Sequence, residues 1–168
     1  MQMSSTTLVP VEEYLRYAEI PNCEYRDGVL YPKSLPARFH GLLEFMLVVM
    51  LRKLGLQAAP EVTVRLSPTK FLVPDVIAAA VLRGPYPIDP VLLCCEILSP
   101  EDRLGGMLAK CEEYHAWGVP FCWVIDPVKR TAREYHSAAE PVLVTSALRV
   151  GELSVSLEEL FSAIDTAP

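Results

Sequence analysis

A carboxylate stands inside one of the most apolar stretches of the chain. In "VLLCCEIL", residues 91–98, Glu96 is surrounded by hydrophobic residues and cysteines, a pattern typical of a fully buried strand. Taking an isolated carboxylate into an apolar interior is so costly that the group must be neutralised, paired or bound to a metal ion. The sequence therefore predicts that another part of the chain, or a metal, supplies a partner for Glu96.

A second carboxylate, Asp75, follows Pro74 in "FLVPDVIAAA". Because proline has no N–H and restricts the residue before it, we expect a strand edge, a bulge or a break at this point. If the strand that carries Glu96 is the neighbour of this segment, the two carboxylates converge at one end of a sheet. Such groups repel each other unless a cation lies between them, and oxygen ligands suit Mg²⁺ or Mn²⁺. We therefore expect Asp75 and Glu96 to bind one of these metals.

A lysine can be placed beside them from helical periodicity. Residues 104–117 have the apolar spacing of a helix, and its buried arc consists of Leu104, Met107, Leu108, Cys111 and Tyr114. Lys110 lies at the edge of this arc, where a lysine can bury its stem and extend its ammonium group toward the end of the sheet. The alternative is a surface pair with Glu112 or Glu113.

The remaining elements alternate between helix and strand. The sequence predicts a short helix over residues 11–20 and a hairpin over 23–31 with Asp27-Gly28 at its turn. Further helices are expected over residues 36–54 and 156–164, the last with Ser156 as N-cap. The other strand-like segments are residues 61–66, 71–81, 91–98, 120–126, 131–136 and 141–145. This pattern predicts an α/β or α+β fold with a mixed sheet flanked by helices.

Length and composition bound the class of protein. With 168 residues, 51% of them apolar, and no linker-like stretch, we expect one domain over residues 1–168. The sequence shows neither a secretory signal nor an apolar run long enough to span a bilayer, so we expect a cytoplasmic protein without a membrane partner. A net charge of -6 is untypical of a surface that attracts nucleic acid as a whole, so any phosphate contact must be local.

Several segments together resemble a known family. The segments "CEYRDGVLY", "FHGLLEFML", "VPDVIAAA", "EILSPEDR" and "LAKCEEYHAWGVPFCWVIDP" follow the order and spacing of the bacterial Uma-two family of "putative restriction endonucleases", a branch of the PD-(D/E)XK nuclease superfamily. The resemblance extends from about Val11 to Phe161. It implies a restriction-endonuclease-like fold and a Mg²⁺-dependent or Mn²⁺-dependent endonuclease that cleaves phosphodiester bonds, with DNA as its nucleic-acid partner.

The resemblance also implies roles for individual residues. Asp75 and Glu96 would hold the metal, and Lys110 would position water or stabilise charge on the phosphate, because the lysine of the nuclease signature lies on the helix after the strand in this family. Glu24 and His40 match further residues of the family pattern, although Glu24 also fits a solvated hairpin residue and His40 a core histidine.

Two further expectations concern activity and assembly. Gly106 stands where relatives often carry an acidic residue, and this departure leaves open a catalytically inactive binding or interaction module with the same fold. The long helix has a second apolar face formed by Leu42, Met46 and Val49, which predicts a homodimer unless the C-terminal segment covers that face.

Overall fold

The computed structural model describes residues 8–16, 23–34, 37–136 and 139–165. Within them the largest sheet has six strands in the order β10-β9-β8-β7-β6-β3. These strands are β3 (Gln57–Pro60), β6 (Val76–Ala79), β7 (Leu93–Ile97), β8 (Phe121–Asp126), β9 (Thr131–His136) and β10 (Val142–Val144). Strands β7 and β8 are parallel and the other neighbours are antiparallel, so the predicted mixed sheet is confirmed.

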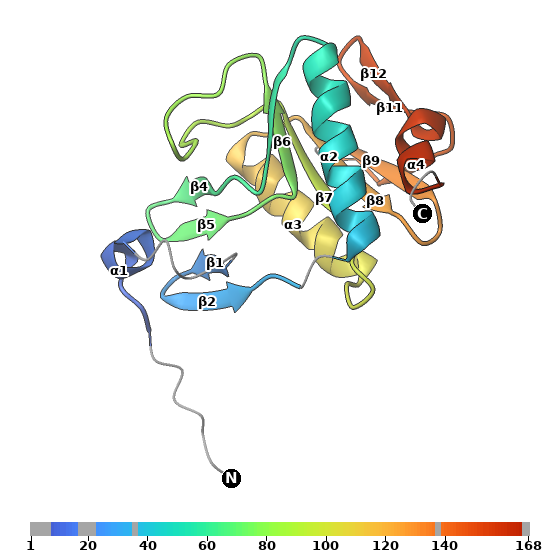
Figure 1. Cartoon of the computed structure of the whole chain (residues 1–168). Helices are drawn as coiled ribbons and strands as arrows, with labels where there is room; N and C mark the ends of the chain where they lie inside the picture. The colour runs from blue at the N-terminus through green and yellow to red at the C-terminus, as the bar shows by residue number, and fades with distance from the viewer. Residues whose placement is uncertain (1–7, 17–22, 35–36, 137–138, 166–168) are drawn as a thin grey trace.

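Helices cover both faces of this sheet (Figure 1). They are α2 (Arg38–Lys53), α3 (Leu104–Trp117) and α4 (Leu157–Asp165). Helix α1 (Val11–Arg16) does not lie on this sheet, because its Tyr14 packs against Tyr25 and Phe71 of a smaller sheet. Leu47 of α2 and Leu160 of α4 share one buried cluster with Cys95, whereas Tyr114 of α3 shares the other with Cys94. Because successive side chains of a strand point to opposite faces, the two adjacent cysteines anchor opposite layers. The predicted α/β architecture is therefore present as helices on both sides of one sheet.

A smaller sheet lies beside the α3 face and carries the N-terminal hairpin (Figure 1). Its strands, in the order β2-β1-β5-β4, are β1 (Cys23–Arg26), β2 (Val29–Pro32), β4 (Val64–Ser67) and β5 (Lys70–Leu72). Asp27 and Gly28 both have positive φ, at 49° and 91°, as a two-residue hairpin turn requires. The predicted hairpin is thus confirmed.

The three longer helices agree with their predictions, including the N-cap: the Ser156 hydroxyl oxygen accepts the N–H of Glu159 at 3.3 Å. The first helix is described to Arg16, and residues 17–20 lie outside the described residues. None of the described helices is long and apolar enough to cross a membrane.

One strand prediction was wrong, and three short strands were not predicted. Residues 71–81 form two strands in different sheets, because Pro74 ends the first and the chain crosses to the large sheet before β6 begins. The edge strand β3 and the hairpin of β11 (Ala147–Val150) with β12 (Leu153–Ser156) were not predicted. Strand β3 has no apolar alternation, and the alternation in β11 and β12 extends over only four residues in each strand, so pairing with neighbouring segments decides their structure.

The break at Pro74 also positions two acidic side chains relative to each other. Strands β6 and β7 are antiparallel with Val76 opposite Cys95. Asp75 immediately precedes the first of these residues and Glu96 immediately follows the second. Both carboxylates therefore lie at the same end of the large sheet, next to the small one.

Candidate active site

A cavity of about 150 Å³ opens at this end of the sheet. Every residue predicted for the site lines it: Glu24, His40, Asp75, Glu96 and Lys110. The residues come from the small sheet, helix α2, the start of β6, strand β7 and helix α3. Tertiary structure therefore gathers five separate segments around one space.

Glu96 finds its partners on helix α3. Its side chain is 2% exposed, and its Oε2 accepts a hydrogen bond from Lys110 Nζ at 2.8 Å. The other carboxylate oxygen, Oε1, accepts from the Tyr114 hydroxyl at 2.6 Å. The carboxylate buried in the apolar strand is thus paired within the chain by an ammonium and a phenol.

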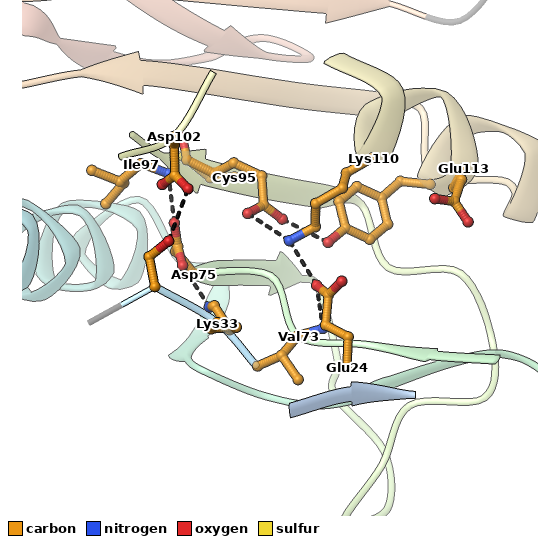
Figure 2. A network of polar contacts seen from close by, with 12 residues as sticks. Glu24, Lys33, Val73, Asp75, Cys95, Ile97, Asp102, Lys110 and Glu113 are labelled. Atoms are coloured by element: carbon orange, nitrogen blue, oxygen red, sulfur yellow. Dashed lines mark hydrogen bonds and ion pairs between the residues drawn. The ribbon is translucent and has the colours of Figure 1, made fainter. Parts of the chain in front are cut away.

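Lys110 joins two carboxylates rather than pairing along its own helix. Its Nζ lies 2.7 Å from Glu24 Oε1 as well as beside Glu96 (Figure 2). Burial alone would lower the pKa of Lys110, but the two carboxylates outweigh burial and raise it, so the side chain stays charged. Glu113, the alternative partner on α3, instead pairs with Arg26 and Lys70 of the small sheet.

Asp75 is held from two sides. Its Oδ2 accepts the backbone N–H of Ile97 at 2.6 Å, and its Oδ1 accepts from Lys33 Nζ at 2.6 Å. Burial would raise the pKa of Asp75, but His40 and Lys33 together favour the charged form and lower the pKa to about 2. Asp75 is therefore an ionised carboxylate throughout the neutral range.

His40 and Glu61 complete a group of possible metal ligands around Asp75. One ligand atom from each of these three residues lies within 4.8 Å of the others. His40 Nε2 is buried, lies 3.6 Å from Asp75 Oδ1 and makes no hydrogen bond among the described residues, while Nδ1 lies 3.3 Å from the Ser99 hydroxyl. If Nδ1 carries the proton and donates it to Ser99, the Nε2 lone pair is free for a metal ion.

Glu61 reaches the cavity from an unusual backbone conformation. It has a φ of 51°, a left-handed value that is uncommon for residues other than glycine. Its N–H donates to the Asp75 carbonyl at 3.0 Å, which ties it to the other acid. Glu96 does not belong to the three-residue group, and its joint role with Asp75 in metal binding stays a prediction.

Burial makes the stability of the metal-free protein sensitive to pH. Desolvation raises the pKa of Glu96 to about 7, with Asp75 adding to the rise and Lys110 opposing it. Desolvation and the acids Glu61 and Asp75 also raise the pKa of Glu44 to about 7. A carboxylate with a raised folded-state pKa binds its proton more tightly when folded, so it removes stability as pH rises from about 4.5 to about 7.

We therefore expect the free energy of unfolding, measured by urea titration in EDTA, to be higher near pH 5 than near pH 7.5. Asp75 acts in the opposite sense, because its lowered pKa contributes stability that is lost as pH falls from 3.8 toward about 2. Glu96→Gln should flatten the slope between the two pH values. An equally steep slope in that variant would show that Glu96 does not titrate there.

Comparisons with known proteins identify the family and the fold of this chain. The family model described as "Putative restriction endonuclease", Uma2, matches residues 11–167. This chain belongs to the Uma2 family. The expected resemblance is therefore confirmed over nearly the whole sequence.

Among solved structures, one similar chain is described as a putative nuclease belonging to DUF820 from Anabaena variabilis ATCC 29413. Its TM-score is 0.79, with 19% sequence identity over 91% of this chain and 97% of that chain. At this identity the likeness shows a shared fold. The search of curated proteins finds no match.

Sequence reasoning missed two charged residues of the Uma2 site, Lys33 and Glu61. Lys33 follows strand β2 in a segment without periodicity, and Glu61 was taken as the first residue of a strand. The need of Asp75 for a counter-charge was a signal that a nearby cation must exist, but nothing local indicated which lysine would supply it.

Proposed function

We propose that this member of the Uma2 family is a divalent-metal-dependent endonuclease that hydrolyses phosphodiester bonds, with DNA as its substrate. The observation that carries the proposal is the convergence of Asp75, Glu96 and Lys110 on one cavity, which also contains a buried imidazole nitrogen that makes no hydrogen bond among the described residues. Two acids and a lysine around a cation position are the groups that phosphodiester hydrolysis needs.

The donor set fits a divalent ion. His40, Glu61 and Asp75 offer one nitrogen and two carboxylate ligands, and the buried His40 Nε2 has no other partner in the described residues. Mg²⁺ favours a shell of oxygen atoms, whereas Mn²⁺ accepts carboxylate and imidazole together. We therefore assign Mn²⁺ as the better fit and Mg²⁺ as the weaker one.

The chain's own residues supply the remaining chemistry. A bound ion would neutralise charge that builds on the phosphate and activate water. Glu96, with its pKa near 7, is suited to take a proton at Oε2 from the attacking water as its O–P bond forms and the P–O bond to the leaving oxygen breaks. Lys110, held between Glu96 and Glu24, would orient that water or stabilise a phosphate oxygen.

Nucleic-acid contact has to be local on a chain of net charge -6. Lys33 and Lys110 line the cavity, and Arg26 and Lys70 are joined to it through Glu113 and Glu24. This arrangement places cationic side chains around the site, while the rest of the surface carries charges of both signs. The substrate class therefore follows from the site and the family, not from the overall charge.

The metal assignment predicts the effect of His40→Gln. Removing the imidazole should weaken Mn²⁺ binding by at least about tenfold and leave the weaker Mg²⁺ binding less affected, because only Mn²⁺ gains from the nitrogen ligand. Isothermal titration calorimetry and the rise in Tm with each ion measure this. His136→Gln, which changes a partly exposed histidine outside the cavity, is the matched control. Equal Mn²⁺ affinity in wild type and His40→Gln would contradict the assignment.

A second candidate function is a binding or interaction module without catalysis. It is favoured by the ammonium groups of Lys33 and Lys110, which already neutralise the site's carboxylates. A chain of this kind would fold with these ion pairs permanently in place, and Mn²⁺ at millimolar concentration would not change its Tm. The same titration therefore separates the two functions.

Homodimer formation through α2 stays a prediction. Helix α4 packs against α2, and Leu42, Met46 and Val49 are half-buried. Phe39 and Phe45 of α2 nevertheless remain 47% and 65% exposed, and these side chains support the proposal of a partner on this helix.

A further inference from the structure

A lysine ammonium lies where the candidate metal ligands converge. Lys33 Nζ is 2.6 Å from Asp75 Oδ1 and 2.9 Å from each carboxylate oxygen of Glu61. Its side chain is 13% exposed, so solvent screens these contacts little. The same two acids form the candidate metal group with His40. An internal cation therefore holds the oxygen atoms that a divalent ion would use.

The two lysines of the cavity pair with different carboxylates, and Figure 2 shows Lys110 beside Glu24 and Lys33 beside Asp75. Lys110 binds Glu96 and Glu24, whereas Lys33 binds Asp75 and Glu61. The stem of Lys110 is fixed on helix α3. Lys33 lies after strand β2 and before helix α2, in neither element, and its long side chain can rotate away without breaking a strand or helix.

We propose that Lys33 is an intrinsic competitor of the metal ion and sets the metal affinity of this site. The inference rests on the proposed metal-dependent function. A dication that binds Asp75 and Glu61 must displace the ammonium of Lys33, because two like charges cannot share these oxygen atoms at contact distance without strong repulsion. The metal-free site is held together by Lys33, and binding exchanges this internal cation for an external one.

This exchange predicts that removing the Lys33 side-chain charge strengthens metal binding, whereas removing a metal ligand or a residue that supports one weakens it. Removing the Lys33 charge leaves the carboxylates of Asp75 and Glu61 without a neutralising cation, so Mn²⁺ should bind to them more tightly. We expect Lys33→Met to lower the Kd for Mn²⁺ by at least about tenfold. It should also lower the Tm of the metal-free protein and enlarge the rise in Tm that Mn²⁺ produces.

Calorimetric titration of Mn²⁺ into EDTA-treated and dialysed full-length protein tests this, with Tm as a second readout. Lys33→Arg keeps the charge and should bind Mn²⁺ about as weakly as wild type. Lys70→Met is the matched control, because it removes the same charge from an ion pair with Glu113 outside the cavity. If Lys33→Met does not fold, as judged by circular dichroism, Lys33→Gln replaces it and keeps a polar side chain.

The outcomes separate this inference from the function on which it rests. An unchanged or higher Kd in Lys33→Met, with Mn²⁺ still bound by wild type, overturns the role of Lys33 and leaves the metal-dependent function standing. Tighter binding in Lys70→Met of the same size as in Lys33→Met also overturns it, because the effect is then one of net charge. If Lys33→Met binds Mn²⁺ and wild type does not, the role of Lys33 is supported. If neither wild type nor any variant binds Mn²⁺, both the role of Lys33 and the metal-dependent function are overturned.

Discussion

Asp75→Asn and Glu96→Gln should each slow the nicking of supercoiled plasmid in Mn²⁺ by about two to three orders of magnitude or more. Asp75→Asn removes a charge from the group that would hold the ion, and Glu96→Gln removes the acid that would take the proton from water. Both replacements preserve side-chain size. The backbone N–H of Ile97 can still donate to the amide oxygen of the new asparagine, so the fold should survive.

Time courses of nicking with Mn²⁺, and with EDTA as the blank, measure the effect. Glu134→Gln is the matched control: Glu134 is also buried, but it accepts from the Arg149 N–H of β11 and does not line the cavity. Its rate should stay close to that of wild type. Cleavage that persists in both site variants, or that continues in EDTA, would contradict the proposed mechanism.

Lys110→Met should destabilise the metal-free protein by about 3–5 kcal/mol. The lysine binds Glu96 at 2.8 Å and Glu24 at 2.7 Å, and removing it leaves two buried carboxylates without their shared cation. The methionine fills a similar volume, so the cost is one of charge and not of packing. Because Glu96 can take up a proton near neutral pH, the loss should be larger near pH 8 than near pH 6.

Urea unfolding in EDTA measures this loss. Lys129→Met is the control, since Lys129 is 77% exposed and forms a long 3.6 Å pair with Asp126, for which we expect a loss of at most about 0.5 kcal/mol. The double variant Lys110→Met with Glu96→Gln should recover part of the stability, because it removes one stranded charge. A loss in Lys110→Met no larger than in the control would show that the buried pairing contributes nothing.

Local patterns in the sequence were sufficient for the features that depend on neighbouring residues. Pro74 marks a real interruption before Asp75, since a proline cannot continue the strand ladder. The apolar arc of α3 places Lys110 at its edge, because helical periodicity fixes which side chains share a face. The apolar run around Glu96 is a buried strand, and burial of a carboxylate in such a strand requires a partner for it.

Tertiary structure decided which groups became partners. Glu96 is paired by Lys110 and Tyr114 across the gap between strand and helix, and the residues that could hold the metal suggested by the sequence are grouped around Asp75 instead. Lys33 comes from a segment without periodicity, and Glu61 from a segment whose alternation predicted a strand that in the structure begins only at Val64. Periodicity reports only burial and local conformation, so it is silent about a side chain in an irregular segment.

The sheet that each strand joins could likewise not be predicted from the sequence. Strands β5 and β6 are separated by three residues, yet they belong to different sheets, and this crossing is what brings the small sheet and Glu24 against the end of the large one. The sequence by itself determined that buried charges at Asp75 and Glu96 needed cations. Which cations they received depends on how distant segments pack together, because ion pairs and strand ladders form between residues that no local pattern connects.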